Sequence, residues 1–209
     1  IILYIVHILC YDIENDGDGR ILALRFEVVI VSNYIYNKVN QLVKRYRTRD
    51  PFEILSALHV VVKESNNFQK LKGYCFVSCR TVYVVINSFL PEAEKRIVAA
   101  HELGHVTLHK QALKMAPMRD SVLYDMRDNT EYEANLFAAD LLLEDQDIED
   151  LSHNEEMDYF SLCSSLYSTP ELMSFKLFSL IRRGHAYRMP LDLDSKFLAK
   201  GHINNQNGI

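Results

Sequence analysis

Apolar side chains recur every three or four positions between residues 34 and 46, and this spacing predicts an amphipathic helix. A second helix is predicted to begin just after Asp50. Asp50 can cap its first turn, Pro51 suits the first helical position, and Glu53 can complete a capping box. The chain therefore enters its central part through two helices.

Three runs rich in β-branched and aromatic residues follow, and we predict strands over 59–63, 73–78 and 81–87. Only Cys79 and Arg80 separate the last two runs, so we expect these strands to pair as a hairpin. Alternation in the last run is incomplete, which is typical of a strand buried on both faces.

The rest of the chain is predicted to be mostly helical. The segments are a helix over 91–110, a loop over 111–129 with a short helix near 122–126, a helix over 130–143, an acidic solvated stretch over 144–150, and helices over 157–167 and 170–183. The last two helices have the outline of a helix-turn-helix. Any helical hairpin packs this way, so we favour a packing role for these two helices over recognition of a DNA groove.

Composition limits the class of protein. Apolar residues make up 48% and charged residues 24% of the chain, as in ordinary globular proteins. The net charge of −5 argues against a protein that mainly coats nucleic acid, although a local basic patch over 44–49 could touch phosphate. No apolar run reaches the ~18 residues of a membrane span, so we expect no membrane segment. The four scattered cysteines are typical of thiols in a reducing cytoplasm.

Within the predicted helix over 91–110 lies the motif His101-Glu102-Leu103-Gly104-His105. Residues four apart share one face of a helix, so His101 and His105 can bind the same Zn²⁺. Glu102 is then the candidate base that takes a proton from the water activated by the metal. The alternative, two buried histidines and a carboxylate without a ligand, would crowd polar groups together without partners and is disfavoured.

A zinc site for hydrolysis needs a third protein ligand, and Glu131 and Glu133 are both candidates. They point in different directions on a helix, so only one can reach the metal. Either can instead close a capping box at the start of its helix. Glu131 is favoured because it shares a stripe of small residues with Asn135, which can hold a histidine ring or the ligand carboxylate by a hydrogen bond.

His109 continues the series of His101 and His105 by another turn. No glycine bend brings it back towards the metal, so capping of the helix end or a hydrogen bond to a ligand is favoured over ligation. Tyr124 and Tyr132 lie close enough in sequence to act as oxyanion donors. Nothing in the sequence selects either, and packing is preferred for both.

These motifs resemble the ImmA/IrrE family of zinc metallopeptidases. The resemblance rests on AHELGH at 100–105 with Leu108-His109, and on EYEANLFAADLL at 131–142. It implies Zn²⁺ bound by His101, His105 and a glutamate at the position of Glu131. It also implies a cytoplasmic enzyme, carried on phages or mobile elements, that cleaves a helix-turn-helix repressor.

We therefore predict an α+β fold with a mainly helical, zincin-like core and a small three-stranded β-sheet, followed by a helical, helix-turn-helix-like tail. The predicted division is an N-terminal extension over 1–33, a zinc metallopeptidase domain over 34–150 and a C-terminal tail over 151–209. The predicted function is hydrolysis of a peptide bond in a regulatory protein. The alternative is a zinc-containing DNA-binding or sensor protein with weak or no peptidase activity.

Overall fold

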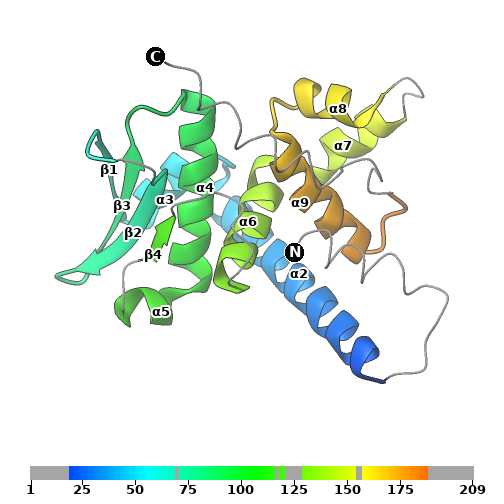
Figure 1. Ribbon diagram of the computed structural model, residues 1–209, viewed down its shortest axis with the longest axis horizontal. Coiled ribbons are helices and arrows are strands. Elements are labelled where there is room, and N and C mark those ends of the chain that lie inside the picture. Colours follow the sequence, from blue (N-terminus) through cyan, green and yellow to red (C-terminus); the bar gives the residue numbers. More distant parts are fainter. Residues whose placement is uncertain (1–18, 69–70, 116–117, 121–128, 154–156, 188–209) are drawn as a thin grey trace, which may run out of the picture.

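The computed structural model describes residues 19–68, 71–115, 118–120, 129–153 and 157–187. Figure 1 shows a small sheet on one side of helix α4 and the helices α6, α9 and α2 on the other side. The mainly helical α+β fold is confirmed. In chain order the elements are α2 (Gly19–Tyr46), α3 (Pro51–Ala57), β1 (Val61–Ser65), β2 (Gly73–Ser78), β3 (Thr81–Asn87), α4 (Glu92–Leu108), α5 (Lys110–Met115), β4 (Met118–Asp120), α6 (Asn129–Leu142), α7 (Asp145–Ser152), α8 (Tyr159–Ser165) and α9 (Pro170–Arg182).

Of the two helices predicted before the strands, the first begins earlier than expected and the second begins as expected. Helix α2 begins at Gly19 and not at residue 34, so the predicted start is wrong. Helix α2 lies against α6 and α9 and buries Ile35 and Val39 completely. At α3 the predicted cap is confirmed, since the carboxylate of Asp50 accepts hydrogen bonds from two backbone N–H groups.

The sheet has the strand order β1-β3-β2-β4, with β1 parallel to β3 and the other pairs antiparallel. The predicted hairpin between β2 and β3 is confirmed. Its turn residues Cys79 and Arg80 have φ angles of 49° and 66°, as a two-residue turn of this hand requires. Strand β3 buries Val84, Val85 and Ile86 and contacts α4. It pairs with both β1 and β2, so it is an inner strand of the sheet.

Two segments predicted as irregular contain regular structure. The predicted loop over 111–129 includes most of α5 and the edge strand β4, which pairs with β2. The short helix predicted near 122–126 lies outside the described residues. The acidic stretch over 144–150 is largely exposed, as expected, but it forms helix α7 around the fully buried Ile148.

The tail packs onto the core through α9. This helix lies against α6 and α2, and it buries Leu172, Met173, Phe175, Lys176, Leu177, Ser179 and Leu180. These side chains are therefore unavailable for reading a DNA groove. In the part of the chain that the structure describes, every helix is too short or too polar to cross a membrane.

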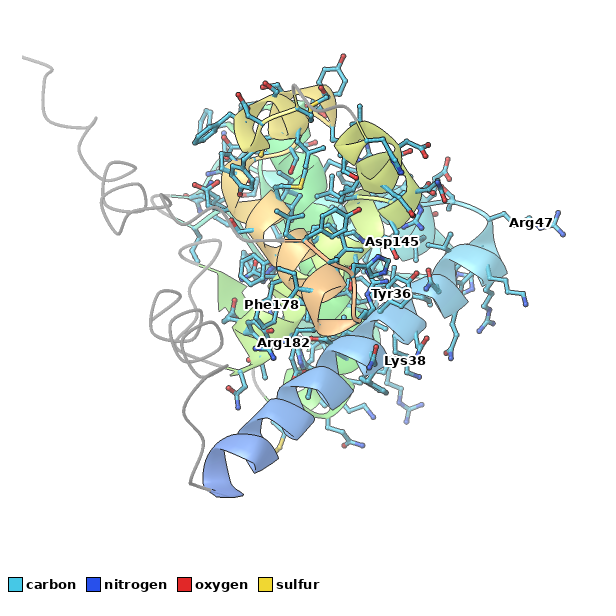
Figure 2. All side chains as sticks on the ribbon, turned by 90° about the vertical axis from the view of Figure 1, so that its right-hand side faces the viewer. Tyr36, Lys38, Arg47, Asp145, Phe178 and Arg182 are labelled. Carbon is cyan, nitrogen blue, oxygen red and sulfur yellow. The ribbon has the colours of Figure 1, made fainter. Side chains whose placement is uncertain are left out.

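A buried ionic cluster joins α9 to the C-terminal end of α6 and to α7. Lys176 donates to Asp140 at 3.0 Å and to Asp145 at 2.6 Å, and Ser179 donates to Asp140 at 2.9 Å. Arg183 binds Asp145 through two nitrogens and stacks over the ring of Tyr36 on α2. Figure 2 labels Tyr36 and Asp145, two of the residues that the Arg183 guanidinium contacts. The charges in this cluster are paired despite their burial.

Helices α4 and α6 cross closely at Gly104. A methyl group added at Gly104 would lie 3.1 Å from Cα and 3.3 Å from the carbonyl oxygen of Ala134, and 3.3 Å from Cβ of Phe137. Two of these three atoms belong to the backbone of α6 and can move only with the helix. Glycine at this position therefore sets the separation of the two helices.

We expect Gly104→Val to lower the free energy of unfolding by about 1–3 kcal/mol, because the larger side chain must push α6 away from α4. Chemical denaturation followed by circular dichroism measures this change. Ala93→Val, at an exposed position of the same helix, is the control and should cost less than about 1 kcal/mol. Equal stability of the two variants would show that the crossing tolerates a larger side chain.

Candidate metal centre

His101 and His105 project from one face of α4 into the interior, and both side chains are fully buried. Their Nε2 atoms lie 2.9 Å apart, and the two rings meet edge to face. The one-turn spacing that the sequence predicted thus brings both imidazoles to one point.

Glu131 approaches this point from the first turn of α6. One carboxylate oxygen lies 3.3 Å from Nε2 of His101, and the other lies 3.4 Å from Nε2 of His105. Among the described residues, His101, His105 and Glu131 form a group able to hold a metal ion, with ligand atoms within 4.8 Å of one another. The close crossing of α4 and α6 at Gly104 makes this approach possible.

The Nδ1 atoms of both histidines, which face away from the candidate metal site, make hydrogen bonds to other side chains. The Nδ1 of His101 lies 2.9 Å from Oδ1 of Asn135, one turn beyond Glu131 on α6. The Nδ1 of His105 lies 3.1 Å from Nδ1 of His109, and Nε2 of His109 lies 2.9 Å from the carboxylate of Glu133. Asn135, His109 and Glu133 thus surround the central group without joining it.

These hydrogen bonds assign the ring protons. Asn135 Oδ1 can only accept, so His101 carries its proton on Nδ1. The carboxylate of Glu133 requires the proton of His109 on Nε2, so Nδ1 of His109 accepts and Nδ1 of His105 donates. Both Nε2 atoms then point to the place where they meet each other and the carboxylate of Glu131.

Two imidazole nitrogens and a carboxylate converge at one buried point, where their lone pairs can bind a cation. Burial lowers the pKa of His105 to about 4, so its ring is neutral at neutral pH. Two neutral imidazoles and one carboxylate are donors that divalent metal ions such as Zn²⁺ accept. The arrangement therefore fits a bound metal ion.

Glu102 is buried beside His101 and lies against strand β2. A Cβ at Gly73 would lie 3.0 Å from Oε1 of Glu102 and 2.5 Å from a methyl carbon of Val98. Only glycine leaves room there for the carboxylate and for the close approach of β2 to α4. The sequence analysis did not single out Gly73, although a glycine in a strand commonly marks such an approach.

The two tyrosines considered as oxyanion donors are not brought to this point by the described structure. Tyr132 packs its ring against Phe175 and Phe178 of α9, and burial raises the pKa of its hydroxyl. The packing role preferred for Tyr132 agrees with these contacts. Tyr124 lies outside the described residues.

Comparison with known proteins identifies the family of the chain. Residues 57–175 match the family model of the IrrE N-terminal-like domain, Peptidase_M78. The chain is 39% identical over 107 residues to "Uncharacterized immunity region protein 2" of Bacillus phage phi105, covering 51% of this chain and 66% of that protein. It is 27% identical over 118 residues to "Metallopeptidase ImmA" of Bacillus subtilis, covering 56% of this chain and 68% of that protein.

The matched stretch thus spans about two thirds of the length of both relatives, with 66% of one and 68% of the other covered. The family match over residues 57–175 contains α4 and α6, and so all the residues that converge at the candidate metal centre. The family match, which covers more than half of the chain, agrees with the resemblance found in the two motifs. The chain belongs to the Peptidase_M78 family of IrrE N-terminal-like domains.

Proposed function

We propose that this protein is a zinc-dependent endopeptidase that cleaves a helix-turn-helix repressor of a phage or mobile element. The observation that carries the proposal is the convergence of His101, His105 and Glu131 beside the buried Glu102. The substrate class is supported by the match to a phage immunity-region protein and by the resemblance to ImmA/IrrE peptidases.

In this proposal His101, His105 and Glu131 hold the zinc ion. Zinc supplies Lewis acidity, which lowers the pKa of a water towards about 7 and polarises the carbonyl of the scissile bond. Asn135 accepts from Nδ1 of His101 and so orients Nε2 of that ring towards the metal site. Three protein ligands leave a further coordination position for the chemistry, as hydrolytic zinc sites require.

Glu102 is assigned the proton transfers. Its carboxylate accepts the proton from the attacking water and then gives it to the leaving amine, whose bond to the carbonyl carbon breaks. The burial of Glu102 keeps bulk water away from the carboxylate and strengthens its interaction with charges nearby. Glu102 lies next to His101 but outside the group of three candidate ligands, so base and ligands are separate residues.

The alternative of a DNA-binding sensor receives less support from the tail. A recognition helix needs an exposed face, and the candidate helix α9 covers the core with most of its length. Its Lys176 is fully buried and paired with two carboxylates, so this charge cannot contact phosphate.

To test the proposal, the purified protein is incubated with candidate helix-turn-helix repressors of the phage or mobile element that carries its gene. We expect about one zinc per chain, cleavage of the repressor, loss of cleavage after chelation, and recovery on adding Zn²⁺. His101→Ala should lose both the metal and the cleavage. Arg96→Ala, at an exposed position of the same helix, is the control and should retain both.

Metal analysis and gel electrophoresis of the repressor provide the two measurements. A wild-type protein that contains zinc but leaves the repressor intact would refute the assigned substrate and keep the metal site. Cleavage by the zinc-free protein would refute the mechanism.

A further inference from the structure

The two histidines of the centre are supported in different ways. His101 rests on a neutral amide, whereas His105 begins a hydrogen-bond series that passes through His109 to the carboxylate of Glu133. His109 is 9% exposed and Glu133 is 30% exposed in its side chain, so the series runs from the interior to the surface.

Backbone geometry places His109 for this contact. It is the residue that ends α4, and its N–H donates to the carbonyl oxygen of His105. One turn separates the two residues, which brings their Nδ1 atoms to 3.1 Å. His109 therefore contacts His105 on its Nδ1 side and is not part of the candidate ligand group.

Helix α6 supplies the other end of the series. Glu131 and Glu133 are two residues apart and point to different sides of the helix. One faces Nε2 of His101 and His105, and the other faces Nε2 of His109. The two glutamates, which the sequence left as alternatives, thus have different neighbours and are suited to different tasks.

We propose that His109 and Glu133 are positioning residues that set the orientation, the tautomer and the donor strength of His105 towards the metal. This inference rests on the proposed zinc site. The carboxylate of Glu133 attracts the proton on Nε2 of His109, and Nδ1 of His109 in turn attracts the proton on Nδ1 of His105. Electron density then increases at Nε2 of His105, which becomes a stronger ligand.

The alternative for the same contacts is a purely structural role. The pair of His109 and Glu133 joins the end of α4 to the start of α6, and such a bridge could serve only to hold the helices together. The two roles differ in what they change. A positioning pair changes the affinity for metal and the environment of the bound ion, whereas a bridge acts mainly on the free energy of unfolding.

The test measures Zn²⁺ affinity of the full chain by competition with a chromophoric chelator. We expect His109→Leu and Glu133→Ala each to weaken Zn²⁺ binding by about 10–100-fold. Glu133→Gln should recover part of the loss, because its amide oxygen still accepts from His109. Glu149→Ala, which removes an exposed carboxylate from α7, is the control and should bind like the wild type.

Two further readouts isolate the positioning role. Adding Glu133→Ala to His109→Leu should weaken binding no further, because Glu133 acts through His109. With Co²⁺ as the probe, the visible absorption bands of His109→Leu should shift from those of the wild type. Full additivity of the two changes would contradict a series.

Unchanged Zn²⁺ affinity in the single variants, together with a lower free energy of unfolding, would overturn the inference and leave a structural bridge. That result would not touch the proposed function, because the wild type would still bind zinc. A wild-type protein that binds no zinc would overturn both proposals at once. The two failures are therefore distinguishable.

Discussion

Replacing Glu102 with glutamine is expected to slow cleavage of the repressor by about 10²–10⁴-fold while zinc remains bound. The amide has nearly the size of the carboxylate and fits the same space against Gly73, but it cannot take a proton from water. The candidate ligands His101, His105 and Glu131 are unchanged in this variant, so metal content should stay near that of the wild type.

The comparison is made by measuring cleavage rate and zinc content on the same preparations. Glu94→Gln is the matched control, because it makes the same chemical change on the same helix at a half-exposed site paired with Lys72. This control should cleave at the wild-type rate. Normal cleavage by Glu102→Gln would show that another group moves the proton.

Replacing Lys176 with methionine is expected to lower the free energy of unfolding by about 3–5 kcal/mol. The side chain of Lys176 is 1% exposed and that of Asp140 is fully buried. Burial raises the pKa of Asp140, and the ammonium of Lys176 opposes this shift. Without that ammonium, the interior would hold a carboxylate that has lost its closest positive partner.

Denaturation by urea measures this loss. Lys114→Met, which removes an exposed lysine from α5, is the control and should change the free energy of unfolding by less than about 0.5 kcal/mol. Combining Lys176→Met with Asp140→Asn should recover part of the stability, because the uncompensated charge is also removed. A wild-type stability in Lys176→Met would show that solvent or Arg183 replaces the lost partner.

Features fixed by local sequence could be predicted well. Three such features depend only on residues that are close together in the chain. They are the cap at Asp50, the two-residue turn at Cys79 and Arg80, and the shared face of His101 and His105. The physical rules for such neighbours are simple, and the structure agrees with them.

Features fixed by contacts between distant segments could not be predicted. Strand β4 pairs with β2, which lies about 45 residues earlier in the chain, and local pattern gives no sign of that partner. The role of Gly73 depends on the position of Glu102, which lies on another element. The sequence favoured Glu131 over Glu133 from the face it shares with Asn135, but the contact of Glu133 with His109 depends on how α4 and α6 cross.

Helix α6 carries a charged cluster at each end. Glu131 in its first turn faces the histidines of α4, and Asp140 near its last turn is bound by Lys176 and Ser179 of α9. A single helix of 14 residues therefore connects the candidate metal centre with the C-terminal helices. Loss of α9 would remove the Lys176 and Ser179 partners of Asp140 together with the packing of α9 on α6. We therefore expect local unfolding of the C-terminal helices to loosen the helix that presents Glu131.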